Sequence, residues 1–138
     1  MSVTAAPRFL DLTEDAREST VEGVLGAVRA ASQIGRSAFL VRGVDENQTI
    51  EGVVVAPVNG YPSAEDMCDL VGLTEGVGGA AGALGTDIDG DGFECVVAGA
   101  VLTINAEDAQ DITMCNVTYT EATATLPPVI DSNVDDCA

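Results

Sequence analysis

Apolar side chains recur at helical spacing along residues 3–43. They return to one side of a 3.6-residue period, while most charged side chains fall elsewhere, which predicts one long amphipathic helix. Acidic side chains precede basic ones along this stretch, the order that the helix macrodipole favours. Such a helix must pack on the rest of the chain. Its apolar positions are Leu12, Ala16, Val21, Val24, Leu25, Val28, Ala31, Ile34, Ala38 and Phe39.

The next part of the chain alternates turn-forming and strand-forming segments. The predicted segments are a polar turn at 44–48, a strand at 49–56, a turn at 59–63 and a short helix at 64–71. Ser63 is placed to cap the short helix, and Asp66 stands near the capping-box position.

A glycine-rich connection at 72–86 leads to two further predicted strands. The stretch 93–104 is apolar on both faces, which predicts a central strand, and Gly99 within it marks a bulge or a close approach to the helix. The alternating stretch 114–120 predicts another strand. At 138 residues we expect a single domain, 1–138.

Composition narrows the function classes. The formal net charge is −18, with 23 acidic residues against five basic ones, so the surface repels nucleic-acid phosphates. The chain has no histidine and no lysine, and cysteines that are paired cannot act as nucleophiles, so we do not expect an enzyme. A pair of carboxylates could act on glycosides, but nothing in the sequence places two across a cleft. No apolar run reaches the roughly 18 residues of a membrane-spanning helix.

The cysteines point to an oxidising compartment. Their even number, without C-x-x-C spacing or histidine, favours disulfides over a structural zinc site. Spacing alone leaves all three pairings of four cysteines open. They are Cys68, Cys95, Cys115 and Cys137.

Short stretches at the start, middle and end of the chain carry a family resemblance. They are Val3-Thr-Ala-Ala-Pro-Arg-Phe-Leu-Asp-Leu12, Gly23-Val-Leu-Gly-Ala-Val-Arg-Ala-Ala31, Gly60-Tyr-Pro62 and Cys115-Asn-Val-Thr-Tyr-Thr120. These stretches resemble type IV pilins, most closely the mannose-sensitive haemagglutinin (MSHA) pilins, and residues 64–113 match least well. The resemblance implies an α+β fold in which a long N-terminal helix, 3–43, packs on an antiparallel β-sheet within 44–138. Pro7 stands where the family has a helix-bending proline.

The resemblance also implies a function, a location and a disulfide pairing. Such a subunit polymerises with identical subunits through its helix into a surface pilus for attachment and biofilm formation, with a surface or glycan as receptor. In the family a basic leader and an apolar segment come before this point, so we expect a soluble domain whose membrane contact runs only through that segment. The subunit is then anchored in the inner membrane before assembly and extracellular afterwards. Pilins close the C-terminal segment by a disulfide, which predicts Cys115–Cys137 and leaves Cys68–Cys95.

The sharpest local motif is Asp87-Ile-Asp-Gly-Asp-Gly-Phe93. Alternate carboxylates followed by Gly form the front half of an EF-hand-type loop, which predicts structural Ca²⁺ held by Asp87, Asp89, Asp91 and the Phe93 carbonyl. The twelfth position is Ala98, so another carboxylate has to close the shell. A Cys68–Cys95 bridge would bring Asp69 beside the loop, and Glu94 and Asp66 are weaker candidates. The alternative to a calcium site is that the Asp-Gly repeats form only a solvated acidic turn.

Two other function classes remain open. A type II secretion pseudopilin shares the helix and sometimes binds calcium, although the C-terminal cysteines and the Gly-Tyr-Pro match favour a pilus. A stand-alone calcium-dependent adhesin module would bind glycans without any filament.

Overall fold

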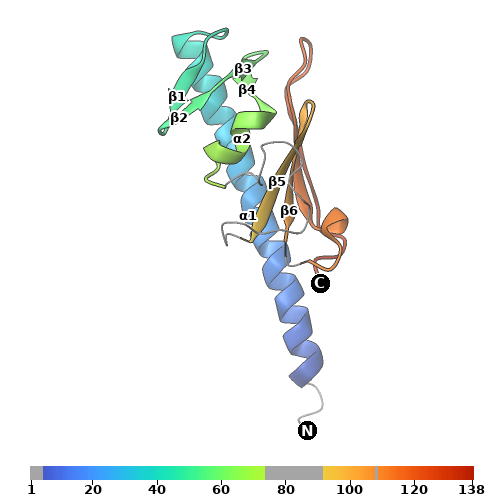
Figure 1. Cartoon of the computed structure of the whole chain (residues 1–138). Helices are drawn as coiled ribbons and strands as arrows, with labels where there is room; N and C mark the ends of the chain where they lie inside the picture. The colour runs from blue at the N-terminus through green and yellow to red at the C-terminus, as the bar shows by residue number, and fades with distance from the viewer. Residues whose placement is uncertain (1–4, 74–91, 108) are drawn as a thin grey trace.

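The N-terminal segment of the chain forms one continuous helix. The computed structural model describes residues 5–73, 92–107 and 109–138, with side chains described from residue 14 onward. Helix α1 covers Ala5–Arg42, 38 residues, which confirms the predicted long helix. At 1.5 Å per residue it is about 57 Å long. Its N-terminal part extends well past the rest of the fold (Figure 1).

The buried side of α1 is narrower than the apolar pattern suggests. Val21, Val28 and Phe39 are fully buried, and they lie on one line along the helix. Ile34, expected on the buried side, is 49% exposed. At 100° per residue it points about 140° away from that line, outside the arc that the sheet covers. The expectation was therefore wrong for Ile34, and also for Ala16, which is exposed on the same side of the helix.

Two small hairpins follow α1 where one strand, 49–56, was predicted. Strands β1 (Gln48–Ile50) and β2 (Val53–Val55) pair antiparallel, and the turn between them has φ of 50° at Glu51 and 85° at Gly52. Positive φ at both central positions is the type I′ pattern that matches strand twist in a two-residue hairpin. The prediction of one strand was wrong because the β-branched residues on both sides of Glu51-Gly52 outweighed the turn signal between them.

The second hairpin joins β3 (Pro57–Val58) to β4 (Tyr61–Pro62). Its turn, Asn59-Gly60, has φ of 53° and 79°, again the type I′ pattern. The hairpin lies against α1, so the turn predicted at 59–63 is confirmed and its second half forms a strand.

Helix α2, Ala64–Leu70, begins as predicted. The Ser63 side chain accepts a hydrogen bond from the Asp66 backbone N–H at 3.2 Å, as an N-cap does. The Asp66 carboxylate in turn accepts the Ala56 backbone N–H at 2.8 Å and the Ser63 hydroxyl at 2.8 Å. Asp66 thus ties α2 to the end of the first hairpin.

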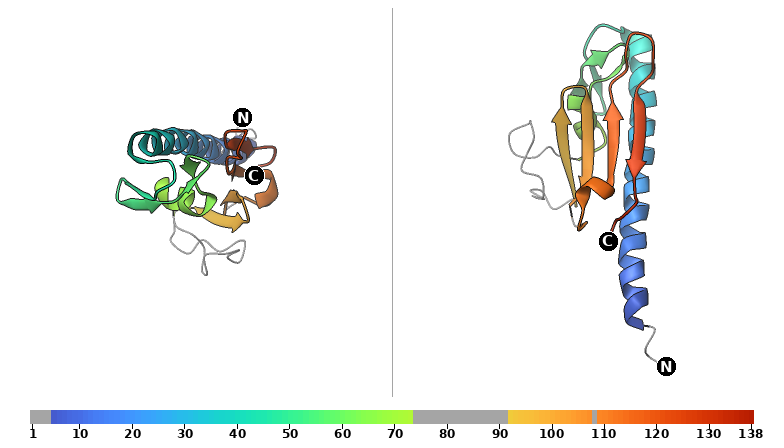
Figure 2. Two further views of the ribbon diagram at one scale, coloured as in Figure 1. Left: turned by 90° about the horizontal axis from the view of Figure 1, so that it is seen from above. Right: turned by 90° about the vertical axis from the view of Figure 1, so that its right-hand side faces the viewer.

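A four-stranded antiparallel sheet forms the other layer, in the order β5-β6-β7-β8. Its strands are β5 (Phe93–Ala98), β6 (Val101–Ala106), β7 (Asn116–Thr120) and β8 (Val129–Asn133), with the short 3₁₀ helix η2 (Ile112–Met114) before β7. Figure 2 shows the strands side by side along α1. The fold is therefore α+β, a long N-terminal helix with antiparallel sheets.

One central strand over 93–104 was a wrong prediction. The segment folds back at Gly99-Ala100, with Ala98 paired to Val101. Gly99 has φ of 60° and is the only one of the two turn residues with positive φ, the pattern of a type II′ turn. Gly99 therefore makes a turn and neither a bulge nor a contact with α1. The strand predicted at 114–120 is confirmed as β7, and β8 was not predicted.

The two faces of the sheet differ in chemistry. The face toward α1 is apolar and carries Cys95, Ile104, Val117 and Tyr119, all buried. The opposite face, called here the outer face, carries a cross-strand row formed by Glu94, Asn105, Asn116 and Asn133.

Tyr119 connects the sheet to the second hairpin. Its side chain is fully buried, and its hydroxyl donates to the Pro62 carbonyl oxygen at 2.6 Å. Burial raises the pKa of Tyr119 above its usual range, and a side-chain hydrogen bond with Ser32 of α1 partly opposes this. Helix, hairpin and sheet therefore meet at one phenol.

Candidate functional site

The exposed side of α1 carries a continuous set of small or apolar residues without charge. All of these residues are exposed, and they lie on one side of the helix, opposite the line of Val21, Val28 and Phe39. We call them the uncharged strip: Ala16, Gly23, Ala27, Ala30, Ile34 and Val41. The carboxylates Glu18 and Glu22 lie on a different side. A strip of this kind lets another helix approach closely, because side-chain size sets the interaxial distance.

The middle of the uncharged strip borders an apolar hollow of about 230 Å³. Ala27, Ala30 and Ile34 line it from α1, and Ile50 and Leu70 line it from β1 and α2. One exposed carboxylate, Glu51, stands among them. The surface available for contact is therefore wider than the helix alone.

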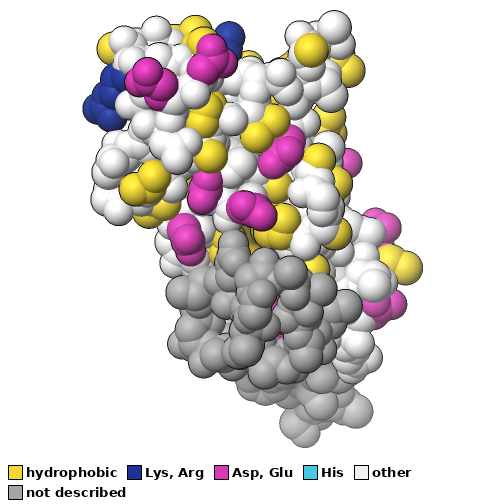
Figure 3. All heavy atoms as spheres, turned by 45° about the horizontal axis from the view of Figure 1, so that its top comes forward, with side chains coloured by type: hydrophobic (Ala, Val, Ile, Leu, Met, Phe, Trp, Pro, Cys, Tyr) yellow, Lys and Arg dark blue, Asp and Glu magenta, His cyan; other side chains and the backbone are white. Residues whose placement is uncertain are grey.

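Acidic side chains dominate the charged surface elsewhere. In the view of Figure 3, carboxylates are spread across the face, and basic side chains show only near the top, where α1 ends. This distribution accords with the formal charge of −18. Among the described residues no helix combines the length and the apolar character that crossing a membrane requires.

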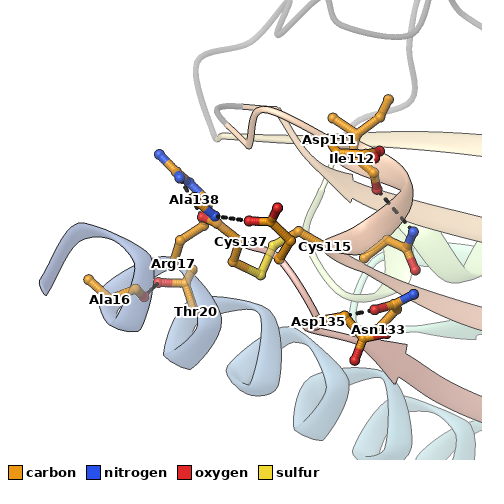
Figure 4. Close-up of a disulfide and its surroundings, with 12 residues drawn as sticks. Ala16, Arg17, Thr20, Asp111, Ile112, Cys115, Asn133, Asp135, Cys137 and Ala138 are labelled. Atoms are coloured by element: carbon orange, nitrogen blue, oxygen red, sulfur yellow. Dashed lines mark hydrogen bonds between the residues drawn. A yellow bond between two sulfur atoms is a disulfide. The ribbon is translucent and has the colours of Figure 1, made fainter. Parts of the chain in front are cut away.

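The C-terminal segment is held to the sheet and to α1. Cys115 and Cys137 form a disulfide with 5.0 Å between their Cα atoms, which confirms the predicted pair. The Arg17 guanidinium of α1 donates to the Cys137 carbonyl oxygen at 2.6 Å (Figure 4). The Gln110 backbone N–H donates to the Ala138 carbonyl at 2.8 Å. The last residues therefore fix the sheet to a defined point on the helix.

The second disulfide joins Cys68 of α2 to Cys95 of β5, as predicted, with 6.3 Å between their Cα atoms. Both sulfur atoms lie in the main core, where the two residues are buried. Two disulfides fit an extracellular or periplasmic protein.

The predicted calcium ligands lie only partly within the described chain. Asp87, Asp89 and Asp91 are outside the described residues, so the loop remains a prediction from sequence. Phe93 begins β5 and is buried, while Asp69 lies exposed on α2, next to the disulfide partner of β5. Within residues 5–73, 92–107 and 109–138, no group of three side chains that could bind a metal is found.

Two carboxylates that sequence analysis ranked low or missed lie near the N-terminal end of β5. They are Glu94 of β5 and Glu107, which directly follows β6. Glu94 is only 2% exposed, and the Glu107 backbone N–H donates to the Gly92 carbonyl oxygen at 3.0 Å. Alternation along the paired strands puts both carboxylates on the outer face, beside the end of the predicted loop. Sequence analysis named Glu94 as a weaker ligand and missed Glu107, which only strand pairing places here. Asp66, also named, is engaged in capping α2.

No protein-family model, curated protein or solved structure matches the chain. Its function therefore has to be argued from its own residues and geometry.

Proposed function

We propose that this chain is the globular domain of a structural subunit of an MSHA-like type IV pilus. The observation that supports the proposal most directly is the uncharged strip on a 38-residue helix that reaches past the rest of the fold. A single domain gains nothing from keeping Ile34 and Val41 exposed on such a helix. Contact with the helices of identical subunits would remove this apolar surface from water.

The charge distribution accords with assembly through α1. Carboxylates on the packing surface would repel one another, and the uncharged strip has none. The acidic side chains elsewhere would face outward from a filament and keep it soluble. The disulfide at the C-terminus and the Arg17 hydrogen bond to Cys137 would keep the sheet fixed on the helix under load. The proposed roles are surface attachment and biofilm formation, without catalysis.

A structural Ca²⁺ site is the second part of the proposal. Asp87, Asp89 and Asp91 would supply the first ligands, with the Phe93 carbonyl and Asp69 completing the shell. Binding only to the folded state would stabilise the domain wherever calcium exceeds its dissociation constant. We expect millimolar Ca²⁺ to raise the melting temperature and a chelator to reverse the rise. An Asp89→Asn variant that responds to Ca²⁺ like the parent would contradict this site.

Filament assembly can be tested with two variants that add the same charge to α1. Ala27→Glu puts a carboxylate on the uncharged strip, and Gln33→Glu puts one on the side that already carries charges; both positions are exposed. In cells expressing the full gene, Ala27→Glu should abolish filaments seen by electron microscopy, and Gln33→Glu should not. Equal melting temperatures of the two soluble domains would show that both variants fold.

Other outcomes would point elsewhere. Normal filaments with Ala27→Glu would contradict packing through the uncharged strip. If deleting the gene stops export of secreted proteins and leaves surface filaments intact, the chain is a type II secretion pseudopilin.

A further inference from the structure

The chain contains two Asn-x-Thr triplets, the pattern at which N-linked oligosaccharides are attached to exported proteins. They are Asn47-Gln-Thr49 and Asn116-Val-Thr118, and neither has proline at its middle position. So short a pattern often arises by chance, and only its structural setting shows which asparagine an enzyme can reach. The two disulfides fit an extracellular or periplasmic protein, the class that meets such enzymes.

The second triplet lies inside the four-stranded sheet. Asn116 is 8% exposed and begins β7, where it pairs with Asn105 of β6 on one side and Asn133 of β8 on the other. Its Nδ2 donates to the Ile112 carbonyl oxygen at 3.0 Å and to the Thr113 carbonyl oxygen at 3.2 Å. This nitrogen is therefore engaged within the fold, and an enzyme would have to separate β7 from both neighbouring strands to reach it.

The first triplet lies on the surface, between the end of α1 and the first hairpin. Asn47 directly precedes β1, and both Asn47 and Thr49 are exposed. Strand β1 is three residues long and belongs to a two-stranded sheet at the end of the molecule opposite the N-terminus (Figure 1). A hairpin this small opens at lower cost than a central strand, so the triplet can bend into the peptide-binding site of an enzyme.

The surface around Asn47 has room for a large polar group. Residues 44–47 are all exposed, so a glycan on Asn47 would displace no packed side chain. Val44 and Val54 are exposed apolar residues beside the triplet, and Val54 is the cross-strand partner of Thr49. A hydrated oligosaccharide at this position would shield both valines and increase solubility.

We propose that Asn47 is a site of N-linked glycosylation in the folded domain and that Asn116 is not. The co-substrate is an oligosaccharide linked to a polyprenyl diphosphate, and a membrane-bound oligosaccharyltransferase carries out the transfer. The Asn47 Nδ2 forms a bond to the anomeric carbon of the first sugar as the bond between that carbon and the diphosphate oxygen breaks. The bonding electrons leave with the lipid diphosphate, and Nδ2 gives up one proton to a base of the enzyme. The inference depends on export of the chain and not on filament assembly.

The test incubates the purified chain, with both disulfides intact, with an oligosaccharyltransferase that recognises Asn-x-Thr and a polyprenyl-diphosphate oligosaccharide of known mass. Mass spectrometry of the intact protein should show one added oligosaccharide. Cleavage after glutamate puts the two acceptors on different peptides, because Asn47 comes before Glu51 and Asn116 lies between Glu107 and Glu121. The added mass should lie on the Asn47 peptide. Protein that has been reduced and alkylated, and so cannot refold, should accept a second oligosaccharide at Asn116.

Thr49→Val keeps a β-branched side chain and removes the hydroxyl that defines the triplet, so it should abolish the addition, whereas Thr49→Ser should retain it. Thr118→Val is the matched control: it destroys the second triplet, leaves Asn116 in place, and should not change modification of the folded protein. The Asn47 peptide of the protein isolated from cells that naturally make it should also carry a glycan. An unmodified Asn47 in either sample, or addition at Asn116 in the folded protein, would overturn the inference.

Discussion

Gly35 marks the closest approach between α1 and the second hairpin, and alanine at this position should destabilise the protein. A Cβ atom built there would lie 2.3 Å from Pro62 Cγ and 2.9 Å from Pro62 Cδ. Carbon atoms in favourable contact are about 3.5–4.0 Å apart, so one of the two elements would have to move by more than 1 Å. Pro62 cannot move freely, since its ring is buried and its carbonyl oxygen accepts the Tyr119 hydroxyl.

The expected magnitude follows from three effects. Alanine in place of glycine inside a helix gains about 1 kcal/mol from backbone propensity. Overpacking costs about 1–3 kcal/mol, and loss of the Tyr119 hydrogen bond costs about 1 kcal/mol more. We therefore expect Gly35→Ala to lower the free energy of unfolding by about 2 kcal/mol, a fall in melting temperature of several degrees.

Gly26→Ala is the control in the same helix. Apart from its chain neighbours and the adjacent backbone of α1, no atom of the described residues lies within 4 Å of its Cβ position. Only the propensity gain therefore applies, and the variant should be more stable than the parent by up to about 1 kcal/mol. Urea unfolding with both disulfides intact gives the two free energies, and unchanged m-values would show that the denatured state is the same. If Gly35→Ala is as stable as Gly26→Ala, the close packing of α1 on Pro62 is refuted.

Three further changes test other contacts. Arg17→Met should lower the free energy of unfolding in urea by about 1 kcal/mol through loss of the hydrogen bond to Cys137, whereas exposed Arg29→Met should change it by less than about 0.5 kcal/mol; equal effects would contradict a role for that bond. Replacing both Cys115 and Cys137 by serine should cost about 3 kcal/mol in the same assay, and no loss would show that the C-terminal loop is held by other contacts. Because burial raises the pKa of Tyr119, the unfolded chain loses this proton near pH 10 while the folded protein keeps it, so stability should fall as pH rises above about 10. Tyr119→Phe should be less stable at neutral pH and should fall less steeply at alkaline pH; parallel curves would exclude Tyr119 as the cause.

The predicted strands show where local pattern is insufficient. Residues 49–56 and 93–104 are rich in β-branched and apolar side chains, and each was taken as one strand. Gly52 and Gly99 turn both segments back on themselves, with φ of 85° and 60°. A glycine inside an apolar run is compatible with a bulge, a close approach or a turn, and only pairing with a neighbouring strand decides among them.

The candidate site residues also divide into those that local sequence pattern indicates and those that only strand pairing brings together. The carboxylates of 87–91 suggest a cation because their spacing is local. By contrast, Glu107 is 13 residues from Glu94 in the chain and reaches the same face only because β5 and β6 pair.

The sequence by itself determined α1, the cap of α2 by Ser63 and the presence of disulfides, since helical periodicity, capping and cysteine count are properties of short segments or of composition. Only the tertiary structure decided which side of α1 is buried, why Gly35 has no side chain and which carboxylates share the outer face of the sheet. Each of these depends on contacts between segments far apart in the chain. Pattern along one helix cannot specify them, because it gives the period of the apolar positions and not the width of the surface that covers them.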